Sequence, residues 1–108
     1  MAFSVALPDH WDVSDDTVSF RQVVESAVCS YQALDRAVRE GLVKVIDRVH
    51  AGRGSARRLT VEEALMVMVV AAIAANADAS FLGTMRAMRL AGAKITPRGL
   101  VIPVRTAA

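Results

Sequence analysis

The chain has 108 residues with 13 Lys/Arg and 11 Asp/Glu, so its formal net charge is only +2, and 54% of its residues are hydrophobic. This length supports one hydrophobic core and excludes two independent ones, so residues 1–108 are expected to form a single small helical domain. The one cysteine, Cys29, excludes an intrachain disulfide and the thiolate clusters of common zinc sites. We expect neither a cofactor nor a metal.

The charges are distributed unevenly along the chain. Up to Gly52 there are five Lys/Arg against eight Asp/Glu, and from Arg53 onward there are eight against three. A basic C-terminal half favours a polyanion or an acidic protein surface as the partner. The first basic residue is Arg21, so the N-terminal segment does not carry the positive charge expected of a signal peptide. The longest apolar run, Ala64 to Ala75, would span only ~18 Å as a helix. Since a bilayer core is ~30 Å thick, we expect a cytoplasmic protein with no membrane contact.

Residues 1–16 are predicted to form an N-terminal arm. Phe3, Val5 and Leu7 alternate with smaller residues, which is typical of a short strand. This strand could pair with the C-terminal end of the chain. The sequence Ser-Asp-Asp-Thr at 14–17 is rich in N-cap residues, so a helix is expected to begin there.

Residues 17–51 are predicted to form one long amphipathic helix. Apolar residues recur at alternating spacings of four and three, which creates a seam along one side, as in a bundle or coiled coil. Charged pairs such as Arg36 and Glu40 are four residues apart on a solvated face, and Gly41 weakens the middle of the helix. Such a seam needs a partner helix, so we expect a homodimer or another protein partner. The expected oligomer-interface residues are Phe20, Val24, Tyr31, Leu34, Val38 and Val45.

Residues 52–58 are predicted to form a basic loop before a second helix. Thr60, with a glutamate three residues later, forms a capping box that specifies the start of this helix. Arg57 and Arg58 stand beside the free amides of the helix start, where they either hold a phosphate or belong to a solvated loop. From Val61 to Ala77 the helix is apolar almost all the way round, which indicates a central position or a place in an oligomer contact.

A turn at residues 76–79 leads into a short basic helix, Ser80 to Ala91. Small residues at four-residue spacing leave one side of this helix smooth enough for a DNA groove or another helix. The chain then passes through Gly92 into a predicted β-hairpin. Pro97 and Gly99 suit the turn of this hairpin and place the arginine between them at its tip.

The order helix, turn, helix, hairpin over residues 60–104 resembles the winged helix-turn-helix family. The similarity lies in FLGTMRAMRLAGAKITPRGLVIPV, an amphipathic helix ending in Ala-Gly, followed by a strand, a Pro-Arg-Gly turn and an aliphatic strand. The predicted fold is mainly α, a winged-helix-like three-helix core with a small C-terminal β-hairpin to which the N-terminus could add a third strand. The resemblance implies that the last helix enters the major groove and that the hairpin touches the backbone. The candidate nucleic-acid-binding residues are Arg57, Arg58, Ser80, Thr84, Arg86, Arg89, Lys94 and Arg98.

The sequence departs from this family in two ways. The helix before the turn is longer and more apolar than is usual, and the last helix has no Asn or Gln to read base edges. The same residues therefore also fit phosphate binding without sequence preference, or no nucleic acid at all.

Catalytic chemistry has weaker support than binding. His10 and His50 are far apart in the sequence, and Cys29 lies in an apolar-patterned segment, so no metal-ligand or triad spacing is present. We therefore expect a small non-catalytic protein that binds nucleic acid or regulates through it, acting as a dimer. The alternative is a helical protein–protein interaction module, such as an assembly subunit, adaptor or inhibitor, that uses its long apolar seam.

Overall fold

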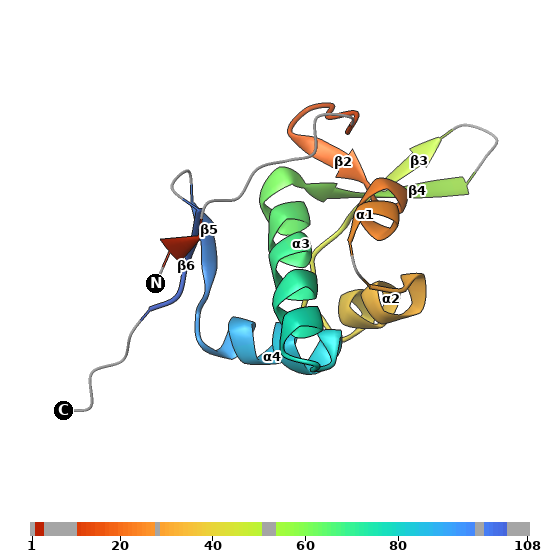
Figure 1. The fold of residues 1–108 in the computed structure, drawn as a ribbon. Helices are drawn as coiled ribbons and strands as arrows, with labels where there is room; N and C mark the ends of the chain where they lie inside the picture. The colour runs from red at the N-terminus through yellow and green to blue at the C-terminus, as the bar shows by residue number, and fades with distance from the viewer. Residues whose placement is uncertain (1, 4–10, 28, 51–53, 97–98, 104–108) are drawn as a thin grey trace.

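The computed structural model describes residues 2–3, 11–27, 29–50, 54–96 and 99–103 (Figure 1). Within these residues the protein is mainly helical, with four α-helices and small antiparallel sheets. In chain order the elements are β1 (Ala2–Phe3), β2 (Thr17–Ser19), α1 (Phe20–Ser26), α2 (Tyr31–Arg39), β3 (Ile46–His50), β4 (Gly54–Thr60), α3 (Val61–Asn76), α4 (Phe81–Leu90), β5 (Lys94–Thr96) and β6 (Gly99–Val101).

Helix α3 stands at the centre of the molecule. The β5–β6 hairpin lies on one side of it, while α1, α2 and the sheet with strand order β2-β4-β3 lie on the other (Figure 1). Helix α4 crosses the lower end of α3, and the two helix axes are bent by 120° (Figure 1). The α3 side chains Ala64, Met66, Val67, Val70, Ala71 and Ala74 are buried, which makes this helix the centre of one shared core.

The single long helix predicted over residues 17–51 is wrong, because this segment folds as β2, α1, α2 and β3. A new helix begins after Ser30, whose hydroxyl accepts a hydrogen bond from the Ala33 amide at 3.1 Å. Gly41 then follows the end of α2 with φ +76°, a left-handed conformation that glycine adopts without steric cost. The segment beyond it is rich in β-branched residues, which favour a strand.

The predicted basic loop at 52–58 is also largely a strand. Residues 54–60 form β4, which pairs antiparallel with β3 on one edge and with β2 on the other. In this register Val18 of β2 lies opposite Leu59 of β4, and both side chains are fully buried. Burial of one face against the helices gives this segment the reason to be a strand that its polar sequence alone does not supply.

The seam predicted to hold a dimer faces the core of its own chain. Phe20 and Leu34 are buried, and the valines of the seam are partly buried against the same core. Tyr31 differs, with 54% of its surface exposed. Two short helices that each bury one face reproduce the apolar spacing of one long helix. For this reason the sequence predicts a dimer interface where the structure has part of the core. Phe20 and Leu34 are not available to a second copy.

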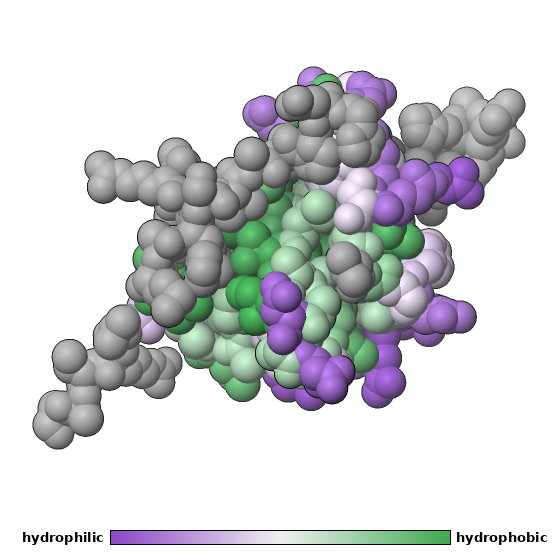
Figure 2. All heavy atoms as spheres, viewed as in Figure 1, coloured by the Kyte–Doolittle hydropathy of each residue, from purple (hydrophilic) through white to green (hydrophobic). Residues whose placement is uncertain are grey.

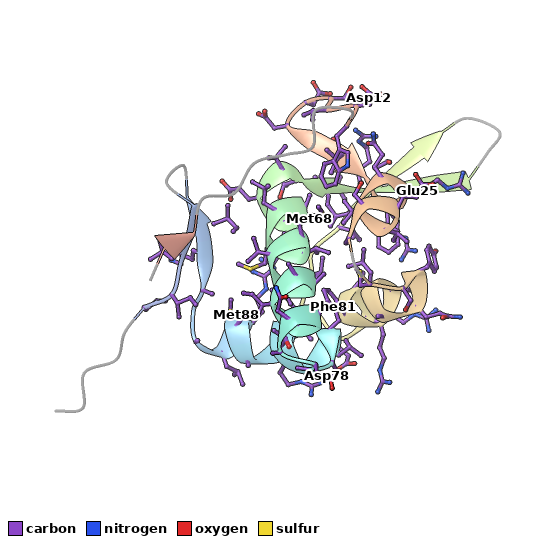
Figure 3. All side chains as sticks on the ribbon, in the orientation of Figure 1. Asp12, Glu25, Met68, Asp78, Phe81 and Met88 are labelled. Atoms are coloured by element: carbon purple, nitrogen blue, oxygen red, sulfur yellow. The ribbon has the colours of Figure 1, made fainter. Side chains whose placement is uncertain are left out.

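The elements predicted after residue 60, namely two helices joined by a turn and a small hairpin, are confirmed. The Thr60 hydroxyl accepts the Glu63 amide at 3.2 Å and caps α3, and the Ser80 hydroxyl accepts the Gly83 amide at 3.0 Å and caps α4. Asp78 makes the turn between these helices with φ +52°, and Figure 3 shows it at the lower end of α3. Strands β5 and β6 form the small antiparallel hairpin, and β1 pairs antiparallel with β6.

The N-terminal arm contributes to the core where the structure describes it. Trp11 is 6% exposed, and its Nε1 donates a hydrogen bond to Ser26 Oγ at 2.7 Å.

Apolar residues gather over α3 on the visible face of the molecule (Figure 2). Among the described residues no single helix has the length and apolar character of a membrane span, and α3 with α4 reach it only together, across their bend.

Candidate nucleic-acid interface

The order helix, turn, helix, hairpin occurs in the first half of the molecule as well as the second. Helices α1 and α2 are joined by residues 27–30, and Ser19 and Ser30 cap their starts. The β3–β4 hairpin follows α2, and β2 adds a third strand to it. The arrangement expected only over residues 60–104 is therefore present over residues 17–60, in the region predicted to be one helix.

Helix α2 has a buried inner face and an exposed outer face. Leu34 is buried on the inner side. On the outer side Gln32 is exposed, and the side chains of Arg36 and Arg39 are 71% and 79% exposed. Arginine and glutamine are the side chains that make bidentate contacts with guanine and adenine edges. The outer face of α2 therefore has the chemistry that the last helix of the chain lacks.

Arg57 fastens α2 to the β3–β4 hairpin. Its Nη1 donates to Asp35 Oδ1 at 2.6 Å, and its Nη2 donates to the Tyr31 hydroxyl. The guanidinium also lies over the Phe20 ring, 4.0 Å from the centroid, and the Phe20 and Tyr31 rings meet edge to face at 5.3 Å. Since these residues come from β4, α1 and α2, the cluster fixes the positions of the three elements relative to one another.

Arg58, like Arg57, makes contacts within the chain, and the phosphate contact considered for these two residues stays a prediction. Arg58 donates from Nε to Thr17 Oγ1 at 2.7 Å and from Nη2 to the Thr17 carbonyl at 3.0 Å. Both arginines are partly buried, and each joins β4 to another element. Their charge serves the packing of this sheet and of the helices beside it.

Glu40, just beyond α2, holds two arginines at once. Its Oε2 accepts a hydrogen bond from Arg36 Nε at 3.0 Å, and its Oε1 accepts one from Arg86 Nη2 at 2.6 Å. The hydrogen bond from Arg86 is the main cause that lowers the pKa of Glu40, because it stabilises the ionised form. The carboxylate is therefore ionised at neutral pH.

Asp35 repeats this arrangement one turn earlier. Its Oδ2 lies 3.1 Å from Arg39 Nε, while its Oδ1 accepts the hydrogen bond from Arg57. That hydrogen bond is the main cause that lowers the pKa of Asp35. The outer face of α2 and these two carboxylates form a shallow depression. It is lined by Tyr31, Gln32, Asp35, Arg36, Arg39 and Glu40.

The arginines predicted to read DNA from α4 are engaged with the rest of the chain. Arg86 reaches Glu40 at the end of α2. Arg89 donates from Nη2 to Glu63 of α3 at 2.6 Å and from Nε to the Leu42 carbonyl at 2.8 Å. These contacts tie α4 to α3, to the end of α2 and to the segment after it, so both arginines connect α4 to other elements, Arg89 from a partly buried position and Arg86 at the surface.

The other predicted contact residues of the C-terminal half differ in their local contacts and exposure. Ser80 caps α4, and Thr84 Oγ1 donates to the Ser80 carbonyl at 2.8 Å. Lys94 is exposed at the start of β5. Arg98 lies outside the described residues, so its predicted place at the hairpin tip stays a prediction.

Sequence reasoning missed the outer face of α2. Arg36 and Arg39 were assigned to a solvated face because the predicted seam continued past both ends of α2. The signals that could have revealed a short helix were Ser30, a good N-cap, and Gly41, a good helix end. Between them lie only nine helical residues, of which the outer ones carry the polar groups.

Cys29 lies between α1 and α2 and is partly buried, which raises the pKa of its thiol. Within the part of the chain that the structure describes, no group of three His, Cys, Asp or Glu is arranged to hold a metal ion.

The chain matches no protein-family model, and comparisons with curated proteins and with solved structures find no match. The role of this protein must therefore be inferred from the geometry of the site.

Proposed function

We propose that this protein is a small winged-helix-like DNA-binding protein whose reading helix is α2 and whose wing is the β3–β4 hairpin. The observation that carries this proposal is the exposed outer face of α2, with Gln32, Arg36 and Arg39, on a helix fastened to the hairpin by Arg57. In helix-turn-helix proteins the second helix lies in the major groove and the first crosses the backbone. Helices α2 and α1 take these two places.

The residues of α2 suit both kinds of DNA contact. Gln32 lies in the first turn, the part of a reading helix that reaches base edges, and an amide side chain pairs with adenine. Arg36 and Arg39 follow on the same outer side and suit guanine or phosphate. The β3–β4 hairpin, fastened to α2 by Arg57, would meet the backbone beside the groove.

The proposal is tested by selecting a duplex from a random pool with the native protein, then titrating that labelled duplex at low salt and following fluorescence anisotropy. Replacing Arg36 and Arg39 together by Gln should weaken binding about 30-fold or more, because each good base contact contributes ~1–3 kcal/mol and two are removed. The matched control replaces Arg86 and Lys94 by Gln, which removes the same charge from α4 and β5. A loss confined to this control pair would place the reading helix at α4. If the native protein binds no duplex at low salt, the DNA-binding role is wrong.

A second candidate function is a protein–protein interaction module, favoured by the apolar surface of the C-terminal half. Leu90 at the end of α4 is 75% exposed, and Val101 of β6 is 40% exposed. Apolar residues also gather over α3 on the face seen in Figure 2. A contiguous apolar surface is suited to a protein contact, and a second copy bound there would give a dimer through a surface other than the seam expected from the sequence.

Light scattering after size exclusion separates the two candidates. If this surface holds a second copy, the native protein should elute as a dimer and Leu90→Ser should shift it to a monomer. Val13→Ser is the matched control, because Val13 is 42% exposed but precedes β2 in the other half of the chain. A monomeric native protein, or an equal shift in the control, would argue against an interface at Leu90.

A further inference from the structure

The two exposed arginines of α2 share one arrangement. Arg36 is paired with Glu40, and Arg39 is paired with Asp35, in both cases through Nε. The second oxygen of each carboxylate is held by an arginine from a different element, Arg86 of α4 for Glu40 and Arg57 of β4 for Asp35. Each carboxylate is thus held on one oxygen by an arginine of another element and pairs on the other oxygen with an exposed arginine of α2.

This arrangement orients the exposed guanidinium groups. A guanidinium has five N–H donors, and a contact through Nε leaves the two Nη nitrogens with the other four. A bidentate contact with guanine O6 and N7 needs two parallel donors presented from one edge of the group. With Nε held by a carboxylate, Arg36 and Arg39 present the Nη edge and lose part of the rotamer freedom that binding would otherwise have to remove.

The same carboxylates weaken contacts with phosphate. Binding without sequence preference is driven by arginine and lysine replacing the counterions of the DNA backbone. An arginine already paired with a carboxylate contributes little to this exchange, and the fixed negative charge repels a phosphate at the same place. The penalty falls on phosphate contacts, whereas a guanine edge is neutral and accepts hydrogen bonds from the free Nη donors.

We propose that Asp35 and Glu40 determine the specificity of α2 by orienting Arg36 and Arg39 toward guanine and by holding both arginines back from phosphates. The preferred ligand is accordingly a duplex with guanine in the major groove opposite α2. This inference rests on the proposed DNA-binding function, and it goes further by naming the base class and the residues that select it.

Glu40→Gln is the decisive substitution because it keeps the shape of the side chain and removes its charge. Anisotropy titrations should use two duplexes of equal length, a guanine-containing site selected by the native protein from a random pool and an A·T duplex. We expect the variant to bind the A·T duplex about two- to fivefold more tightly, in line with the modest strength of exposed ion pairs. The slope of log K against log salt should steepen by about 0.9 for each additional phosphate that the variant neutralises.

Two further variants separate orientation from a loosened fold. Arg86→Gln breaks the same link between α2 and α4 but leaves Arg36 paired with Glu40, so it should not tighten binding to the A·T duplex. Arg36→Lys keeps the charge without the planar fork, so it should lose binding to the guanine site and keep binding to the A·T duplex. An equal gain for Arg86→Gln, or an unchanged preference and salt slope for Glu40→Gln, would overturn the inference while the DNA-binding function stands. If the native protein binds neither duplex, the proposed function itself fails.

Discussion

The described part of the molecule contains two helix–hairpin units. The first comprises β2, α1, α2 and the β3–β4 hairpin, on one side of α3; in the second, α4 crosses the lower end of α3 and leads to the β5–β6 hairpin on the other side (Figure 1). The outer face of α2 exposes polar and basic side chains, while α4 exposes small residues, Leu90 and Arg86. In the first unit the brace runs from the hairpin into the helix, through Arg57. In the second it runs from α4 toward the first unit, through Arg86 and Arg89.

This difference teaches that the number of arginines on a helix does not identify a contact surface. Arg86 and Arg89 look free on a helical wheel, but both reach acceptors contributed by residues far away in the sequence. Among the described residues, Arg36 and Arg39 pair with carboxylates of their own helix or its end, and their side chains remain largely exposed. The first unit is therefore suited to contact a ligand, and the second to support the first.

The largest effect should come from breaking the core that the two units share. Leu34→Ala in α2 and Met85→Ala in α4 each remove a fully buried side chain, so each should lower the free energy of unfolding by about 2–5 kcal/mol. Urea unfolding should be followed by Trp11 fluorescence, which reports on the first unit, and by circular dichroism. One coincident transition in both variants is expected because the core is continuous. Two separate transitions would show that the units fold independently.

Removing the arginine contacts that join the elements should lower the free energy of unfolding by less than the core substitutions do. Arg57→Met removes a stacked and hydrogen-bonded guanidinium whose side chain is 23% exposed, so we expect a loss of about 1–3 kcal/mol. Among the described residues Arg89 makes hydrogen bonds but no ring contact. Arg89→Met should therefore lower the free energy of unfolding by less, about 1–2 kcal/mol. Urea midpoints of the two variants at equal m-values give the comparison. A larger loss for Arg89 would make the second unit the better braced one.

Each unit is preceded by a turn with an aspartate at positive φ, which offers a milder test. Asp16 has φ +57° in the turn before β2, and Asp78 has φ +52° in the turn before α4. Glycine tolerates this conformation better, so Asp16→Gly and Asp78→Gly should each raise the free energy of unfolding by about 0.5–1 kcal/mol. Asp12→Gly, which changes a residue outside these turns, should not raise it. Thermal unfolding of both variants and the native protein provides the measurement. A variant with unchanged stability would show that other contacts hold its turn in this conformation.

The smallest effect should be the pH dependence of the first unit. The pKa values of Asp35 and Glu40 are lowered from their usual 3.8 and 4.5, so both groups favour the folded state when ionised. Their contribution is complete above these usual values and is lost as the pH falls through the lowered ones. Because both carboxylates are partly exposed, water screens the effect. The stability of Asp35→Asn and Glu40→Gln should depend less on pH in this acid range than that of the native protein, and identical profiles would contradict the pairing.

The part of the chain after residue 60 was predictable because its signals are local. Thr60 and Ser80 cap helices from within their own first turns, and the hairpin at 94–101 follows from its turn residues and aliphatic strands. The segment at 17–51 was mispredicted because its apolar spacing fits one long helix as well as two short ones. Local helix signals at Ser30 and Gly41 were present but weaker than that periodicity.

The sequence by itself determined the elements whose causes lie within a few residues, namely α3, α4, their caps, the last hairpin and the basic character of the C-terminal half. Only the tertiary structure decided which arginines are engaged and which face outward. The braces join Arg57 to Asp35, Arg86 to Glu40 and Arg89 to the Leu42 carbonyl, over separations of 22 to 47 residues. A periodicity records which side of an element is buried, but the partner of a long charged side chain depends on how the elements pack. For that reason the candidate interface moved from α4 to α2.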